Sequence, residues 1–252
     1  MPDTLAVASL QFKARRPHVH ASRAALVEAV DHAAARASLV VFPEMAVSGY
    51  VFAHRDAVAE VAEVRDGPTF EALAAVAAAR DCAIVGGFAE RDGDELFNSA
   101  WLIDRRGQLV QVYRKTLLYE ADRPWATAGT GDYGTMTVRG ARVAVGICMD
   151  LNDDAFVAHL RATQPDVVAF PTNWVAEEVP TVDVWDYWAW RMSGVRGALV
   201  AANTWGSEHA VGGGSTRFTG RSAVIRGRHL LAHLPATGDG AVSVQLPLTG
   251  GQ

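Results

Sequence analysis

The chain has 252 residues, half of which are hydrophobic, and its formal net charge is −5. This composition excludes a disordered chain, and the length suffices for one α/β domain with a large buried core. Acidic and basic residues are mixed along the chain without a basic block, which argues against a nucleic acid partner.

Three further features bear on the compartment. The chain starts Met1-Pro2-Asp3-Thr4 and continues directly into an apolar segment, without the basic and apolar regions of a signal peptide. No apolar run approaches the ~20 residues that a membrane helix needs. Two cysteines, Cys82 and Cys148, cannot form a disulfide framework. Together these features predict a cytoplasmic protein without a membrane partner.

In chain order, short apolar segments alternate with segments of helical spacing. The sequence predicts strands at 5–12, 39–42, 83–87, 99–103, 109–113, 136–138, 142–147, 167–170, 199–202, 222–225, 229–233 and 241–246. It predicts helices at 20–37, 69–80, 156–163 and 182–195. Most of these helices can cover only one face of a sheet, so the pattern favours an α/β sandwich.

Reactive side chains follow three of these strands. Glu44 comes after the run 39–43, Lys115 after 109–114, and Cys148 after 143–147. A carboxylate, an ammonium and a thiol at strand ends are the groups that cysteine-based acyl transfer requires.

Three motifs surround these residues. They are Phe42-Pro43-Glu44-Met45 with Ser48-Gly49-Tyr50, then Tyr113-Arg114-Lys115-Thr116, then Gly146-Ile147-Cys148-Met149-Asp150. In this order they resemble the three signatures of the nitrilase (carbon–nitrogen hydrolase) superfamily, and the resemblance extends from Leu5 to about Leu246. Within the superfamily, the motifs are most similar in sequence to those of the protein N-terminal amidase branch. The residues that carry this finer resemblance are Met149-Asp150-Leu151, Leu118-Tyr119-Glu120, Asp122 and Trp125.

The resemblance implies a fold and an assembly. It implies a four-layer α-β-β-α sandwich formed by a single carbon–nitrogen hydrolase domain over residues 1–252. It implies no metal and no organic cofactor. Relatives commonly pair two sandwiches, so we expect a homodimer.

The resemblance also assigns roles. Cys148 is the expected nucleophile, and a neighbouring ammonium and a following helix N-terminus would favour its thiolate. Glu44 is the expected general base, with a pKa raised by burial. Lys115 and the backbone N–H of Met149 would stabilise the oxyanion. The other thiol, Cys82, is expected to pack in the core.

The family pattern also includes a fourth catalytic residue. The superfamily usually has a second Glu after the Lys, but counting back from Gly129 leads to Asp122, and Glu120 is the other candidate. In the family, the segment that holds Asn173 and Trp174 lines the substrate pocket.

The resulting hypothesis is an amidase that hydrolyses a non-peptide C–N bond. The substrate would be a primary carboxamide, either a small molecule or the side-chain amide of an N-terminal Asn or Gln. Relatives that act on nitriles or N-carbamoyl groups use the same residues, so these reactions stay open. A binding or scaffold protein on a retained hydrolase fold is the alternative from another class.

Overall fold

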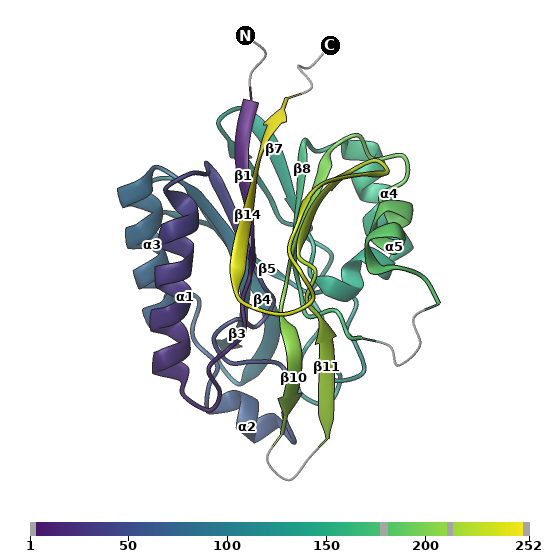
Figure 1. Cartoon of the computed structure of the whole chain (residues 1–252). Helices are drawn as coiled ribbons and strands as arrows, with labels where there is room; N and C mark the ends of the chain where they lie inside the picture. Colours follow the sequence, from purple (N-terminus) through teal and green to yellow (C-terminus); the bar gives the residue numbers. More distant parts are fainter. Residues whose placement is uncertain (1–3, 177–180, 211–213, 249–252) are drawn as a thin grey trace.

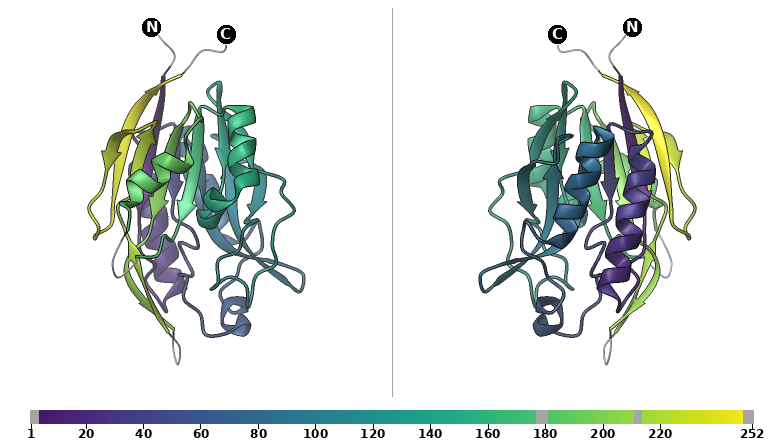
Figure 2. Two further views of the ribbon diagram at one scale, coloured as in Figure 1. Left: turned by 90° about the vertical axis from the view of Figure 1, so that its right-hand side faces the viewer. Right: turned by 90° about the vertical axis from the view of Figure 1, so that its left-hand side faces the viewer.

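A computed structural model describes residues 4–176, 181–210 and 214–248. Two six-stranded sheets pack face to face, and helices cover the outer face of each (Figures 1 and 2). This arrangement is the four-layer α-β-β-α sandwich that the family resemblance implied. None of the helices in these ranges has the length and apolar character that a membrane crossing requires.

The first sheet has the strand order β14-β1-β2-β3-β4-β5. Its strands are β1 (Thr4–Gln11), β2 (Leu39–Phe42), β3 (Ala83–Asp92), β4 (Glu95–Ile103), β5 (Leu109–Arg114) and β14 (Gly240–Pro247). Its outer face is covered by α1 (Val19–Ala34) and α3 (Pro68–Arg80), which lie on the left of Figure 1. The short α2 (Arg55–Ala59) lies at the lower end of the molecule in that view.

The second sheet has the order β13-β12-β9-β8-β7-β6. Its strands are β6 (Thr135–Val138), β7 (Ala141–Val145), β8 (Val167–Thr172), β9 (Ala198–Asn203), β12 (Ala223–Arg226) and β13 (His229–His233). Its outer helices are α4 (Asp154–Thr163) and α5 (Val184–Arg191), on the right of Figure 1. A separate hairpin pairs β10 (Trp205–His209) with β11 (Ser215–Thr219).

The core between the sheets is aliphatic. Val7, Val41, Val143 and Val200 are among its fully or almost fully buried members. Strands β1, β2 and β3 are parallel, and so are β7, β8 and β9. Parallel strands end at the same edge of a sheet, so the segments after β7 and β8 lie together. The Asn173 N–H donates to Glu44, which brings the segment after β2 to the same end of the sandwich.

The structure corrects the prediction in several places. The strand predicted at 83–87 continues to Asp92 and forms a long hairpin with β4. The helix predicted at 182–195 is only Val184–Arg191. The sequence analysis missed α2 and the β10–β11 hairpin, because both are short and neither has a clear hydrophobic period.

Candidate active site

The candidate residues lie where strands of both sheets end. Glu44 follows β2 and Lys115 follows β5 in the first sheet, while Cys148 follows β7 and Asn173 follows β8 in the second. The side chains are buried: relative exposure is 1% for Glu44, 0% for Lys115 and 6% for Cys148. Residues separated by more than a hundred positions are therefore enclosed at one end of the sandwich.

Cys148 lies at a sharp turn. Its backbone is left-handed, with φ of 46°, which is unusual for a residue with a Cβ. It starts the 3-10 helix η1 (Cys148–Asn152), and α4 follows with Asp153 as its N-cap. Met149 is the second residue of η1, and the first N–H groups of a helix have no partner inside it. The turn therefore presents a thiol beside a backbone donor.

Lys115 connects two carboxylates. Its Nζ donates to Glu44 Oε1 at 2.8 Å and to Asp122 Oδ2 at 2.6 Å. The amide of Asn98, on β4, donates to the same two carboxylates at 2.7 Å and 3.1 Å. A buried ammonium between two hydrogen-bonded carboxylates is stabilised as an ion, since each partner compensates the desolvation of the other.

Glu44 is also fixed from the second sheet. The Asn173 N–H donates to Glu44 Oε2 at 2.7 Å, and the Asn173 side chain donates to the Glu44 carbonyl at 2.9 Å. On the other side β3 approaches closely at Gly87, where a Cβ would lie 2.4 Å from the Glu44 Cα. The carboxylate is therefore held from both sheets, and only glycine fits at position 87.

The structure distinguishes the two carboxylates that the sequence left open. Asp122 is fully buried and bonded to Lys115, and it also accepts the Tyr119 N–H at 3.0 Å. Glu120 is exposed. The side chain beside Lys115 is thus that of Asp122, one methylene shorter than the usual Glu.

Burial dominates the electrostatics of the site. It raises the pKa of Glu44, and the charge of Lys115 only partly opposes this. Burial by itself would lower the pKa of Lys115, but Asp122 and Glu44 hold it well above the usual value, so Lys115 stays protonated. Glu44 thus has the raised basicity that the sequence analysis expected of a general base.

Lys115 lowers the pKa of the Cys148 thiol, as expected of a neighbouring ammonium, but other contributions outweigh it. Burial and the charge of Glu44 raise the pKa of Cys148 to about 12, although Lys115 and the Thr172 hydroxyl lower it. Desolvation of a thiolate outweighs the neighbouring ammonium. The resting thiol is therefore neutral, and attack requires a base.

Asp150 is a buried residue to which the sequence analysis gave no role. Its Oδ1 accepts the N–H groups of Thr116 and Leu117, at 3.0 Å and 2.9 Å. Its Oδ2 accepts the Ile147 N–H at 2.8 Å and the Tyr113 hydroxyl at 2.7 Å. One carboxylate thus ties the segment after Lys115 to the turn that presents Cys148. Asn98 was missed as well, because it lies just before the strand predicted at 99–103, which in the structure begins at Glu95.

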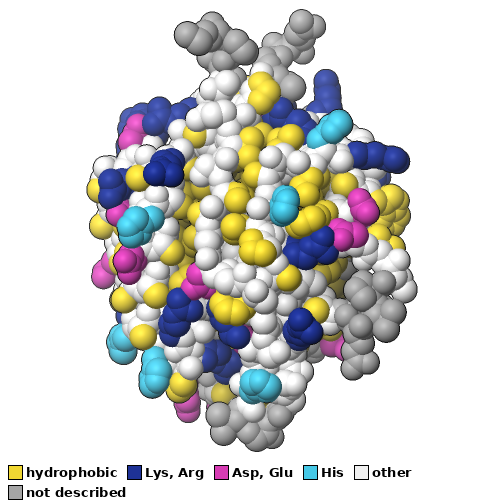
Figure 3. Space-filling model, viewed as in Figure 1, with side chains coloured by type: hydrophobic (Ala, Val, Ile, Leu, Met, Phe, Trp, Pro, Cys, Tyr) yellow, Lys and Arg dark blue, Asp and Glu magenta, His cyan; other side chains and the backbone are white. Residues whose placement is uncertain are grey.

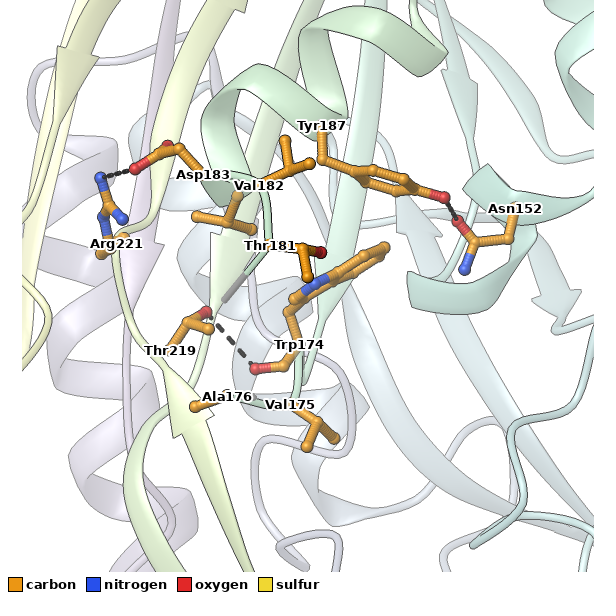
Figure 4. A pocket seen from close by; sticks show the side chains of 11 residues that line it. Asn152, Trp174, Val175, Ala176, Thr181, Val182, Asp183, Tyr187, Thr219 and Arg221 are labelled. Atoms are coloured by element: carbon orange, nitrogen blue, oxygen red, sulfur yellow. Dashed lines mark hydrogen bonds and ion pairs between the residues drawn. The ribbon is translucent and has the colours of Figure 1, made fainter. Parts of the chain in front are cut away.

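A pocket of about 550 Å³ adjoins the site (Figure 4). Trp174 and Tyr187 form an aromatic wall, with ring centroids 5.5 Å apart, and the Tyr187 hydroxyl donates to Asn152 Oδ1 at 2.6 Å. Arg221 and Asp183 pair at the opposite end at 2.7 Å. Among the described residues, neither Glu44, Lys115 nor Cys148 lines this pocket, but Trp174 directly follows Asn173 and Asn152 ends η1.

Three further side chains lie outside this group of residues. Cys82 is buried in the core between the first sheet and its helices, as expected. On α5, the side chain of Trp188 is fully buried, whereas that of Trp190 is 62% exposed. No group of three or more His, Cys, Asp or Glu side chains that could hold a metal ion occurs in the described part of the chain.

The chain is similar to several known proteins. A family model described as carbon-nitrogen hydrolase matches residues 5–249. A nitrilase of Pyrococcus abyssi is 34% identical over 145 residues, which are 57% of this chain and 55% of that protein. A protein N-terminal amidase of Schizosaccharomyces pombe is 25% identical over 236 residues, 77% of this chain and 81% of that protein.

The first curated relatives are matched over only about half of their length. Among solved structures, an amidase from Nesterenkonia sp. superposes with a TM-score of 0.82 at 23% identity, covering 98% of this chain and 92% of that one. At this identity the structural similarity establishes the fold.

Proposed function

The chain belongs to the carbon–nitrogen hydrolase family, and we propose that it hydrolyses a primary carboxamide through a thioester on Cys148. One observation carries the proposal: the ammonium of Lys115 is held between Glu44 and Asp122, and the charges of Lys115 and Glu44 both act on the Cys148 thiol. A base, an oxyanion donor and a nucleophile are thus enclosed together.

In the first half-reaction, Glu44 removes the proton from the Cys148 thiol, and the sulfur attacks the carbonyl carbon. The carbonyl electrons move onto oxygen, where Lys115 and the Met149 N–H stabilise the negative charge. The protonated Glu44 then gives its proton to the nitrogen. The C–N bond breaks, ammonia leaves and an acyl thioester remains.

In the second half-reaction, Glu44 takes a proton from water as the water oxygen attacks the thioester. The C–S bond breaks, the sulfur recovers its proton from Glu44, and the carboxylic acid leaves. The high pKa of Cys148 suits this cycle, because proton transfer is coupled to attack rather than preceding it. Asp122 keeps Lys115 charged and oriented throughout.

The proposed substrate is a small amide or the side-chain amide of an N-terminal Asn or Gln. The pocket walled by Trp174 and Tyr187 has room for the acyl substituent, and protein N-terminal amidases are among the similar proteins. Trp174 directly follows Asn173, whose N–H donates to Glu44, so an acyl group bound beside Trp174 would have its carbonyl towards the site.

Ammonia release across a substrate panel tests the proposal. The panel contains primary amides, nitriles, N-carbamoyl compounds and peptides that start with Asn or Gln, and Cys148→Ala protein serves as the blank. We expect the highest kcat/KM on primary amides or Asn- and Gln-starting peptides. Preferred turnover of nitriles or N-carbamoyl compounds would reassign the reaction. Absence of turnover on every substrate would favour a binding protein.

We also propose a homodimer located in the cytoplasm. Trp190 on α5 is 62% exposed, and Leu230 and Leu231 on β13 are 37% and 42% exposed. Figure 3 shows hydrophobic side chains over the middle of the face that carries β14 and β13, among positive and negative ones. Light scattering across a concentration series should give twice the subunit mass of 26.9 kDa. A constant mass of one subunit at high micromolar concentration contradicts the dimer.

A further inference from the structure

Tyr50 brings an unpaired hydroxyl to the site. The side chain is 3% exposed, and its hydroxyl has no hydrogen-bond partner in the described part of the chain. The same holds for Asn173 Oδ1, although the Asn173 N–H groups are bonded to Glu44. Buried polar atoms are normally paired, so these two oxygens point to a partner that binds from outside.

Tyr50 lies close to the proposed catalytic groups. Its ring centroid lies 5.8 Å from Lys115 Nζ. Burial raises the pKa of its hydroxyl well above the ordinary value, and the charges of Lys115, Asp122, Glu44 and Cys148 all act on it. The hydroxyl is therefore neutral, and its ring lies beside the ammonium of Lys115.

The β10–β11 hairpin holds Tyr50 without using its hydroxyl. Glu208, which is 5% exposed, accepts the N–H groups of Tyr50 and Val51 at 2.8 Å and 3.2 Å and pairs with Arg16 at 3.3 Å. The Tyr50 ring packs edge-to-face on Phe218 of the same hairpin, at 5.9 Å. Backbone and ring contacts fix the residue, so the oxygen has no structural task in this arrangement.

We propose that Tyr50 is a substrate-binding residue whose hydroxyl oxygen, together with Asn173 Oδ1, accepts the N–H groups of the bound carboxamide. Glu208 is its positioning residue. This inference rests on the proposed amidase function. A primary amide offers one carbonyl oxygen and two N–H donors; Lys115 and a backbone N–H serve the oxygen, and the unpaired oxygens of Tyr50 and Asn173 match the N–H groups.

This contact distinguishes amides from substrates without N–H groups. An ester of the same acid, such as p-nitrophenyl butyrate, places no N–H donor at the position of the amide nitrogen. A site that leaves buried acceptors unpaired with such a substrate disfavours it relative to the amide. Tyr50 would therefore contribute to leaving-group selection and not to acyl-group selection.

Tyr50→Phe tests the proposal because it removes one oxygen and keeps the ring. We expect kcat/KM for butyramide to fall about 10- to 100-fold. We expect p-nitrophenolate release from p-nitrophenyl butyrate to change much less, and the unfolding midpoint to be unchanged or higher, since an unpaired buried group is removed. Tyr133→Phe makes the same change on a ring that packs on Phe156, and it should alter none of these quantities.

Glu208 is tested by two variants. Glu208→Ala releases the Tyr50 loop and should lower kcat/KM for butyramide, whereas Glu208→Gln keeps an acceptor oxygen and should restore most of it. Equal butyramide hydrolysis by wild type and Tyr50→Phe, or equal losses on amide and ester, overturns the role of Tyr50 and leaves the amidase function intact. If wild-type protein hydrolyses no primary amide of the panel, the amidase function fails and this contact fails with it.

Discussion

The two sheets contribute different parts of the site. From the first sheet and the loop after β5 come Glu44, Lys115 and Asp122, charged groups already bonded to one another at 2.6–2.8 Å. From the second sheet come Cys148, a neutral thiol, and Trp174, one wall of the open pocket. The first half is a preorganised charge network; the second half holds the proposed nucleophile and one wall of the neighbouring pocket.

Because of this difference, substitutions in the two halves of the site should affect folding stability and activity differently. Removing a member of the charge network leaves buried charges without their partner, which costs both folding free energy and rate. Removing the thiol leaves no buried charge, so the rate should be lost while stability is nearly kept. Each variant below is therefore assayed for turnover and for unfolding.

Cys148→Ala has the largest expected effect on activity. Ammonia release should fall to the level of the blank, because the nucleophile is gone. The free energy of unfolding should change by no more than about 1–2 kcal/mol, since one small buried side chain is trimmed. Cys82→Ala is the matched control, with the other buried thiol removed, and it should remain active. A tenth of wild-type kcat in Cys148→Ala, or an inactive but folded Cys82→Ala, would show that the wrong thiol has been chosen.

Lys115→Met should damage both properties. Loss of one preorganised oxyanion donor lowers kcat by roughly 10²–10³-fold. The buried carboxylates of Glu44 and Asp122 also lose their shared cation, at a cost of about 3–5 kcal/mol in unfolding free energy. Denaturant titration and initial rates measure the two effects. Normal kcat with a raised KM would mean that Lys115 only binds substrate.

Asp122→Asn and Glu120→Gln compare the two candidate carboxylates. Asp122 is bonded to Lys115 and fully buried, so its neutral variant should lower kcat by about 10- to 100-fold through a misoriented Lys115. Glu120 is exposed, so its variant should behave as wild type in both assays. A larger loss in Glu120→Gln than in Asp122→Asn would reject the assignment.

The pH dependence of the wild-type rate should reflect the buried base. Glu44 must be ionised to accept the thiol proton, and burial raises its pKa above the ordinary value of 4.5. As pH falls through this raised pKa, Glu44 is protonated and kcat/KM is lost. The acidic limb of the profile should therefore lie above pH 4.5, and Glu120→Gln should leave it in place. A limb at or below pH 4.5 would show that the base is a solvated carboxylate.

The sequence was sufficient for the parts of the site that depend on strand order. Glu44, Lys115 and Cys148 each follow a strand, so a correct sandwich already brings them together. The contributions of Asn98, Tyr50 and Asp150 could not be read in advance. A polar residue in an apolar segment needs a partner, but the sequence does not say which of several distant groups supplies it.

The pKa shifts at the site could also be predicted only in part from the sequence. The raised pKa of Glu44 was predicted correctly, because burial of a carboxylate acts in one direction. For Cys148, burial and Glu44 oppose Lys115, and their balance depends on depth and distance that the sequence does not contain. The roles of Glu208 and Phe218 on the β10–β11 hairpin were missed for a related reason: both contact Tyr50, which lies more than 150 positions away along the chain.

The central claim is that Cys148 carries the acyl group during turnover. The most direct test is the mass of the peptide that contains Cys148. Wild-type protein is mixed with excess primary amide, quenched in acid within the first turnovers, digested and analysed by mass spectrometry, and the ammonia in the same sample is measured. If Cys148 is the nucleophile, the peptide that contains it gains the mass of the amide minus ammonia. The amount of this acylated peptide should be proportional to the burst of ammonia. A burst of ammonia with an acyl group on Cys82 or on any other residue, and none on Cys148, would contradict it.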